Sequence, residues 1–201
     1  MKKDFDRAIA DYTRAIQLKP DYADALLGRG NCYLDKGQHE RAIADYNRAI
    51  ALYTENPGPA AVWAFNGRGL CNLNLEHSEA AIADFTAALK LNPYQAPVWA
   101  NLGETHYRKK NYEEALKAAL RAVELDANDP YPWRILGNVF FSKRDHGKAV
   151  FAYTQAIRRD ARDAYSYYWR SQAYRALGDK ERARSDYTQA ARLDRRYARQ
   201  G

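Results

Sequence analysis

Apolar and polar residues alternate along the chain with the period of an α-helix, and one such stretch recurs. In RAIADYTRAIQLKP (7–20) the apolar side chains fall at i, i+1, i+4, i+7 and i+8 from Ala8, which places them on one helical stripe. The stretch at 41–54 is identical to it at ten of fourteen positions, and AAIADFTAALKLNP (80–93) is a third version. A proline ends the first and third versions, where a helix must stop. The pattern therefore predicts the same helix several times.

A second helical pattern lies between these copies. Each instance carries a large apolar residue, and a small residue follows it four positions later. Glycine inside a helix costs about 1 kcal/mol relative to alanine, so a glycine that recurs at this place indicates that two helices approach closely there. The five instances are ADALLGRGNCYLDKG (23–37), VWAFNGRGLCNLNLE (62–76), APVWANLGETHYRKK (96–110), PYPWRILGNVFFSKR (130–144) and AYSYYWRSQAYRALG (164–178).

The two patterns alternate, and together they resemble the tetratricopeptide repeat family. The first pattern carries alanine at two fixed positions with an aromatic residue between them in most copies, and proline follows two of the copies. In that family a unit of about 34 residues folds as a helix–turn–helix. The resemblance implies an all-α, right-handed superhelical solenoid of antiparallel helix pairs with about 11 helices. It divides the chain, as one array, into a half repeat (3–22), full repeats (23–56, 62–95, 96–129, 130–163, 164–197), an inserted loop (57–61) and a tail (198–201).

The loop and the two ends depart from a regular array. Asn56, Pro57, Gly58 and Pro59 are a cluster of helix breakers, which we interpret as a surface insertion, with a functional loop as the alternative. The half repeat lacks its partner helix, and the segment after Ala191 is too short for a separate capping helix. Solenoids usually need polar caps, so we expect a fragment of a longer protein or self-association into a homo-oligomer.

Charge is concentrated near the C-terminus. The net charge is +7, and residues 158–201 alone hold twelve Lys/Arg and six Asp/Glu. A nucleic-acid-binding repeat would show a basic stripe along the whole fold, so we expect a protein partner in preference to nucleic acid. The N-terminal lysines precede no apolar run, and no segment has the roughly 18 apolar residues of a membrane span. The sequence thus predicts a cytoplasmic protein with no membrane partner.

No arrangement of residues suggests catalysis. The four histidines are scattered, and His106 takes a place that aromatic residues fill in other units. Cys32 and Cys71 occupy equivalent positions that suit modest buried side chains. The two GRG runs fall at the small-residue positions, where packing explains them better than RNA binding. We therefore predict no enzyme, no cofactor and no metal.

The resemblance implies a concave groove lined by the first helix of each unit, which generally takes a peptide or a partner protein. In the C-terminal half this lining is rich in aromatic residues and arginine, the residue types enriched at binding hot spots. The predicted binding residues are Asn31, Asn66, Asn101, Tyr107, Arg108, Tyr131, Arg134, Asn138, Phe141, Tyr165, Tyr168, Trp169, Gln172 and Arg175. The same unit-by-unit reading also places Asp24, Leu27, Leu34, Trp63, Leu70, Leu73, Ala100, Glu104 and Ile135 in the lining.

This lining predicts an extended or helical partner peptide with acidic and aromatic residues. The asparagines Asn31, Asn101 and Asn138 have the donor and acceptor to hold a backbone amide. Some of the aromatic residues, Tyr131 and Trp169 among them, pack between units in the alternative reading. Chaperone-binding members of the family hold a terminal carboxylate with Lys, Asn, Asn, Lys and Arg across three units. Only isolated asparagines match that set here, so we predict no chaperone carboxylate clamp.

Overall fold

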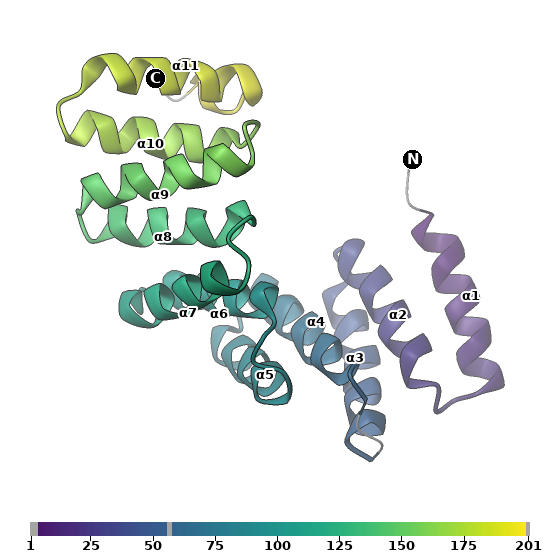
Figure 1. Cartoon of the computed structure of the whole chain (residues 1–201). Helices are drawn as coiled ribbons and strands as arrows, with labels where there is room; N and C mark the ends of the chain where they lie inside the picture. The colour runs from purple at the N-terminus through teal and green to yellow at the C-terminus, as the bar shows by residue number, and fades with distance from the viewer. Residues whose placement is uncertain (1–3, 56–57, 200–201) are drawn as a thin grey trace. The chain divides into compact units, whose positions relative to one another are not determined.

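The computed structural model describes residues 4–55 and 58–199, and their regular structure is all helical. Within these described residues, eleven α-helices follow one another in sequential antiparallel pairs, which confirms the predicted all-α array (Figure 1). Residues 1–3, Asn56 and Pro57 of the predicted loop, and residues 200–201 of the predicted tail lie outside the described residues. The helices are α1 (Phe5–Leu18), α2 (Ala23–Asp35), α3 (His39–Glu55), α4 (Ala61–Asn74), α5 (Ser78–Leu91), α6 (Ala96–Arg108), α7 (Tyr112–Leu125), α8 (Pro130–Ser142), α9 (His146–Arg159), α10 (Ala164–Ala176), α11 (Lys180–Leu193) and the 3-10 helix η1 (Tyr197–Arg199).

Local signals begin the helices and turn the chain between them. Asp4, Asp145 and Asp179 each accept a hydrogen bond from the backbone N–H three residues later, which caps α1, α9 and α11. The turn inside each helix pair holds one residue in the left-handed region. Three of these five residues are not glycine, and for each of them the left-handed conformation costs about 1 kcal/mol. They are Gly37 (φ 71°), Glu76 (62°), Lys110 (63°), Arg144 (62°) and Gly178 (82°).

The chain forms two compact units, residues 1–101 (unit 1) and 102–201 (unit 2), whose boundary falls within α6. In unit 1 the buried Tyr46 ring of α3 lies between glycines of α2 and α4. A Cβ atom added to Gly30 would be 2.8 Å from this ring, and one added to Gly67 would be 2.4 Å from it. The predicted close approach is confirmed at Gly30, and the structure adds a second one at Gly67, because a larger residue at either place would collide with the aromatic side chain.

Unit 2 repeats this packing in α8 to α11, which contact one another in chain order (Figure 1). Its core is built on Ala149, Tyr153 and Ala173, all fully buried. A Cβ atom on Gly137 would be 2.5 Å from the Tyr153 ring, so α8 and α9 meet through the same small–aromatic pair. Phe141, Tyr165 and Trp169 pack on this core from one side, and their aromatic faces remain partly exposed.

A buried ion pair, which we call the Arg–Asp bridge, joins the two helices of three pairs. In each, the guanidinium donates to both carboxylate oxygens of an aspartate in the paired helix. It also donates to a Thr or Asn of the preceding helix. The bridges are Arg29–Asp45 with Thr13, Arg68–Asp84 with Asn47, and Arg170–Asp186 with Thr154. In the helix pairs α6–α7 and α8–α9, the same two positions hold Leu102 with Ala118 and Leu136 with Ala152. The arginine and the aspartate of the bridge are therefore replaced together.

The described ends of the array are more covered than the sequence suggested. Ile16 of α1 is buried against α2 and α3 side chains. At the other end, the backbone carbonyl of Tyr197 accepts a hydrogen bond of 2.6 Å from the Tyr187 hydroxyl. The Tyr197 ring stacks on Tyr168 with centroids 4.7 Å apart. The short tail thus packs on α10 and α11 through one turn of 3-10 helix. Within the described residues, no helix is both long and apolar enough to cross a membrane.

Candidate functional site

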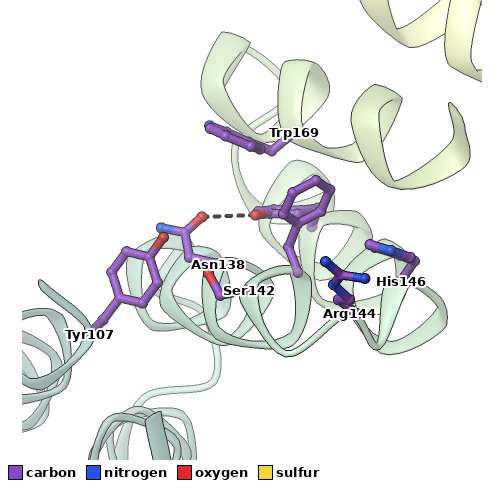
Figure 2. Close-up of a pocket in the computed structure, with 8 residues that line it drawn as sticks. Tyr107, Asn138, Ser142, Arg144, His146 and Trp169 are labelled. Atoms are coloured by element: carbon purple, nitrogen blue, oxygen red, sulfur yellow. Dashed lines mark hydrogen bonds between the residues drawn. The ribbon is translucent and has the colours of Figure 1, made fainter. Parts of the chain in front are cut away.

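A hollow of about 430 Å³ opens on one side of unit 2, between the end of α6 and helices α8, α9 and α10. Figure 2 shows Tyr107, Asn138 and Trp169 around it, and Ser142, Arg144 and His146 further along its wall. We call it the Trp169 pocket; Phe141 and Tyr153 complete its lining. Its walls therefore offer aromatic faces, hydroxyl groups and one guanidinium to a bound chain.

Asn138 is a buried junction in this pocket. Its side-chain oxygen accepts hydrogen bonds from the Tyr153 hydroxyl (2.8 Å, dashed in Figure 2) and from the Tyr165 hydroxyl (3.0 Å). Burial raises the pKa of Tyr165 to about 12 and also raises that of Tyr153, so both hydroxyls stay neutral donors. Because its oxygen is engaged, Asn138 has only its amide N–H groups to offer to a ligand.

The aromatic wall of the pocket is built around Phe141. Its ring lies edge-on to Trp169 and to His146, with centroids 5.2 Å away in each case. Edge-to-face contacts between aromatic rings are favourable, so they hold these rings in position. Among the described residues, the buried Nδ1 atom of His146 has no hydrogen-bond partner. The wall is thus preformed and mainly apolar, with one polar atom that is not engaged.

Arg134, one turn before Asn138 on α8, lies between two tyrosine rings. Its guanidinium is 4.6 Å from the Tyr165 centroid and 5.6 Å from the Tyr131 centroid. The carboxylate of Asp163 is 3.8 Å from Nε, which is an ion pair without hydrogen-bond geometry. Within the described part of the chain, the buried Nε atom has no hydrogen-bond partner. The side chain is 34% exposed, so a ligand can reach it.

Asp163 cannot turn fully toward this guanidinium. It caps α10 by accepting a hydrogen bond from the Ser166 backbone N–H, and its other oxygen accepts one from the Ser166 hydroxyl at 2.5 Å. Arg134 is therefore a positive group whose position is fixed by aromatic rings and whose donors are not saturated. That combination suits a carboxylate from outside.

The predicted residues separate into three groups. One group surrounds Arg134 and the pocket: Tyr107, Tyr131, Arg134, Asn138, Phe141, Tyr165 and Trp169. Tyr168 touches Trp169 edge-on, but it does not line the pocket, and its ring stacks on Tyr197 and lies beside Tyr187. A second group bonds within the protein: Asn31 accepts from Tyr46, Asn101 donates to Asn66, Arg108 pairs with Glu104, and Gln172 donates to Ser171. Arg175 stands apart, exposed beside a different hollow with Lys180, Arg184 and Tyr187.

Three apolar residues that the sequence placed in the lining are core residues instead. Leu73, Ala100 and Ile135 are 5%, 0% and 0% exposed and belong to the core, so they present almost no surface to a ligand. Each packs inward because a first helix must bury part of every turn to hold its partner helix. The reading of the groove was wrong at these positions.

The sequence reading missed Ser142, Arg144 and His146 as pocket residues. Ser142 comes four residues after Asn138 and so shares its helical face. The left-handed Arg144 then reverses the chain and brings His146 back to the same side. A search for polar residues at the turn ends of the first helices would have found them.

This arrangement presents groups that can bind a ligand. Across the described residues, no group of three or more His, Cys, Asp or Glu side chains could hold a metal ion. The pocket offers preformed aromatic surface, amide donors on Asn138 and a cation at Arg134. Chemically, these groups can contact an apolar side chain and a carboxylate.

Comparison with known proteins agrees with this architecture. Among solved structures, YrrB, described as a TPR protein with an unusual peptide-binding site, is 22% identical, covers 92% of each chain and has a TM-score of 0.69. PilF of Pseudomonas aeruginosa is 20% identical, with 96% of this chain and 85% of that chain covered and a TM-score of 0.81. MamA from Desulfovibrio magneticus RS-1 is 20% identical, with 87% and 96% covered and a TM-score of 0.73. At these identities the likeness shows the fold alone.

No curated protein matches the chain in sequence. Family models described as Tetratricopeptide repeat match residues 2–57 and 64–130, and residues 164–197. Because these matches cover most of its length and its helix pairs show the same architecture, the chain belongs to the tetratricopeptide repeat family.

Proposed function

We propose that unit 2 binds an extended segment of a partner protein, with a carboxylate of that segment on Arg134 and an apolar side chain in the Trp169 pocket. Proteins of this family generally mediate protein–protein interactions. YrrB is itself described as having a peptide-binding site. The role proposed is that of a scaffold or adaptor, not of an enzyme.

The observation that carries the proposal is the state of Arg134. A guanidinium has five N–H donors, and a carboxylate fits two of them at once. Here Tyr131 and Tyr165 hold the group by their ring faces, the Asp163 carboxylate stays 3.8 Å away, and the side chain is 34% exposed. Because the rings restrict its motion before binding, a ligand carboxylate meets a preorganised cation.

The neighbouring pocket supplies the apolar part of the recognition. Its volume of about 430 Å³ is in the range of small ligand sites and accommodates one large side chain. Tyr165 links the two parts, since its ring lies under Arg134 and 6.1 Å from the Trp169 ring. An acidic residue and an aromatic or aliphatic residue close to it in the partner would occupy both parts together.

The test is to measure binding of fluorescent peptides selected from a random displayed library against the whole chain. Arg134→Gln keeps the size of the side chain and removes its charge. We expect this variant to bind acidic–apolar peptides at least about tenfold more weakly, which corresponds to about 1.4 kcal/mol. The loss should shrink at high salt, where the charge matters less for the wild type as well.

Arg175→Gln is the matched control, because Arg175 is an exposed arginine of α10 that lies beside another hollow. It should leave the affinity unchanged. Equal affinity of wild type and Arg134→Gln for every selected peptide would contradict the proposal. Replacing Asn138 is not a clean test, because its loss leaves the hydroxyls of Tyr153 and Tyr165 unpaired.

The charge contacts favour a protein partner over nucleic acid. In the basic C-terminal region, Arg182 pairs with Asp179, Arg196 pairs with Asp194, and Arg170 is held in its bridge to Asp186. A phosphate backbone would have to compete with these carboxylates. Homo-oligomer formation stays a separate prediction, tested by the mass of the chain across concentrations.

A further inference from the structure

A second pocket lies on another face of α8, outside the proposed peptide site. It has a volume of about 390 Å³ and is almost wholly apolar. Trp133, Leu136 and Phe140 line it from α8, whereas Arg134, Asn138 and Phe141 belong to the first site. At 100° per residue these two sets occupy different faces of one helix. The lining, which we call the Phe151 pocket, consists of Leu120, Trp133, Leu136, Phe140, Gly147, Lys148, Phe151 and Ala152.

This pocket occurs where an Arg–Asp bridge is missing. Leu136 takes the place of the bridge arginine, Ala152 that of the aspartate, and Leu120 that of the Thr or Asn. Leu136 and Ala152 are buried, so they replace a buried ion pair with a packed apolar contact. Such an exchange is often neutral or stabilising, and it explains these two residues completely.

The replacement of the ion pair does not explain two other apolar residues of the pocket, Leu120 and Phe151. Leu120 is 49% exposed and Phe151 is 58% exposed, so folding of the chain leaves both in water. The α6–α7 pair, which also has Leu and Ala in the bridge positions, carries Thr86 and Lys117 at the places of Leu120 and Phe151. Other helices have small residues at the place of Phe151, namely Ala10, Ala44, Ala83 and Ser185. The loss of a bridge therefore does not require exposed apolar residues.

Cations stand at the rim of the Phe151 pocket. The Lys148 ammonium is 5.6 Å from the Phe140 centroid, and the Arg159 guanidinium is 4.9 Å from the Trp133 centroid. The lining contains no acidic residue, and Lys148 is paired outside the pocket with Asp145. An occupant that brings apolar side chains together with carboxylates complements both the pocket and its rim.

We propose that the Phe151 pocket is a second docking site, and that it takes an acidic amphipathic segment of a partner protein. Two or three large apolar side chains of that segment cover Phe151, Leu120 and Trp133, and its Asp or Glu side chains face Lys148 and Arg159. A second copy of this face is a poor occupant, because the same cations would oppose one another. A concave pocket also suits inserted side chains better than a flat lipid surface.

The test uses the variant Leu120→Thr/Phe151→Ala, which restores residues that the chain itself has at equivalent positions. Random displayed peptides are selected on the whole chain and counter-selected on this variant, and the enriched peptides are measured by fluorescence anisotropy. We expect enriched peptides to carry large apolar residues at helical spacing beside Asp or Glu. We also expect the variant to bind them at least about tenfold more weakly, a loss of about 1.4 kcal/mol, and Arg134→Gln to leave their affinity unchanged.

A second variant keeps the test independent of folding. Lys148 is exposed, so Lys148→Glu should fold normally and still weaken these peptides, by an amount that shrinks as salt rises. Equal binding by wild type and both variants would overturn the proposal. Enriched peptides without acidic residues would do the same.

The other occupants give distinct results. Flotation with anionic vesicles that is lost in Leu120→Thr/Phe151→Ala would assign the pocket to a membrane surface and overturn the proposal. A concentration-dependent dimer that is lost in the same variant would assign it to a second copy. If Arg134→Gln alone gave the contradicting result, the proposed site at Arg134 and the Trp169 pocket would be rejected. The proposal for the Phe151 pocket would stand.

Discussion

Arg29 donates two hydrogen bonds of 2.7 Å, one to each carboxylate oxygen of Asp45. Its remaining nitrogen donates to Thr13, so one side chain fastens α2 to both α1 and α3. The hydrogen bonds to Asp45 raise the pKa of Arg29, as expected for a charge-assisted bidentate pair. Both side chains are largely buried, which makes the pair sensitive to the loss of either member.

The first prediction concerns this pair. Arg29→Leu should destabilise unit 1 by about 3 kcal/mol, because Asp45 stays buried without its cation. Arg29→Leu/Asp45→Ala should recover most of that loss, since Leu136 with Ala152 is the chain's own version of the same exchange. Urea unfolding followed by circular dichroism measures both. A double variant as unstable as the single variant would contradict this account.

The second prediction concerns glycine packing. Gly67→Ala should destabilise the protein by about 1–3 kcal/mol, because its new Cβ atom would lie 2.4 Å from the Tyr46 ring. Gly147 is also helical, but the nearest atom to a Cβ there is 3.9 Å away. Gly147→Ala should therefore stabilise by about 0.5–1 kcal/mol through helix propensity. Thermal unfolding measures both changes in stability. If both substitutions stabilised the protein, or both destabilised it, the packing argument would be refuted.

The third prediction concerns the loss of folding stability at acidic pH. Burial lowers the pKa of His106 below its ordinary 6.5, and Lys109 acts in the same direction against Glu114. The unfolded chain therefore binds the proton more readily than the folded one. The stability that a neutral His106 contributes is complete above about pH 6.5 and is lost as the pH falls through and below it.

His106→Phe tests this, because Phe140 fills the equivalent position of α8. The free energy of unfolding should decline less steeply below about pH 6.5 in this variant than in wild type. The comparison holds every other titrating group constant. Parallel curves for the two proteins would show that His106 does not contribute.

The fourth prediction concerns the buried thiol. Cys71 is fully buried, and burial raises its pKa to about 12. Only the thiolate reacts, so in a Cys32→Ser variant Cys71 should react with a thiol reagent at least about 100-fold more slowly than a free thiol. Its modification should follow unfolding of the helices. Rapid labelling of the native variant would contradict this burial.

The helix pairs could be predicted because their cause is local and recurrent. A small residue four positions after a large apolar residue, glycine in four of the five pairs, marks the close approach, and Gly30 and Gly137 meet Tyr46 and Tyr153 as that pattern requires. Alanine at fixed positions of the partner helix completes the contact. Steric fit of this kind depends on residue size and spacing along the chain, so the sequence alone is enough to predict the helix pairs.

The site could be predicted only in part, because it depends on distances between helices. That Arg134 is held between Tyr131 and Tyr165 follows from how α8 and α10 pack, which spacing along the chain does not show. Arg175 was placed in the groove, but it lies six residues after Trp169. Six residues turn a helix by about 240°, which carries it to another face. Hydrogen bonds such as Tyr46 to Asn31 likewise appear only in three dimensions.

The Asn138 junction also sets how unit 2 can come apart. One oxygen of α8 accepts hydrogen bonds from Tyr153 of α9 and Tyr165 of α10, so separation of either helix leaves a buried hydroxyl without its acceptor. Local opening of one helix is therefore penalised by its neighbours. Amide hydrogen exchange in α8, α9 and α10 should converge on a common opening free energy, as expected for one cooperative unit and not for three separable hairpin segments.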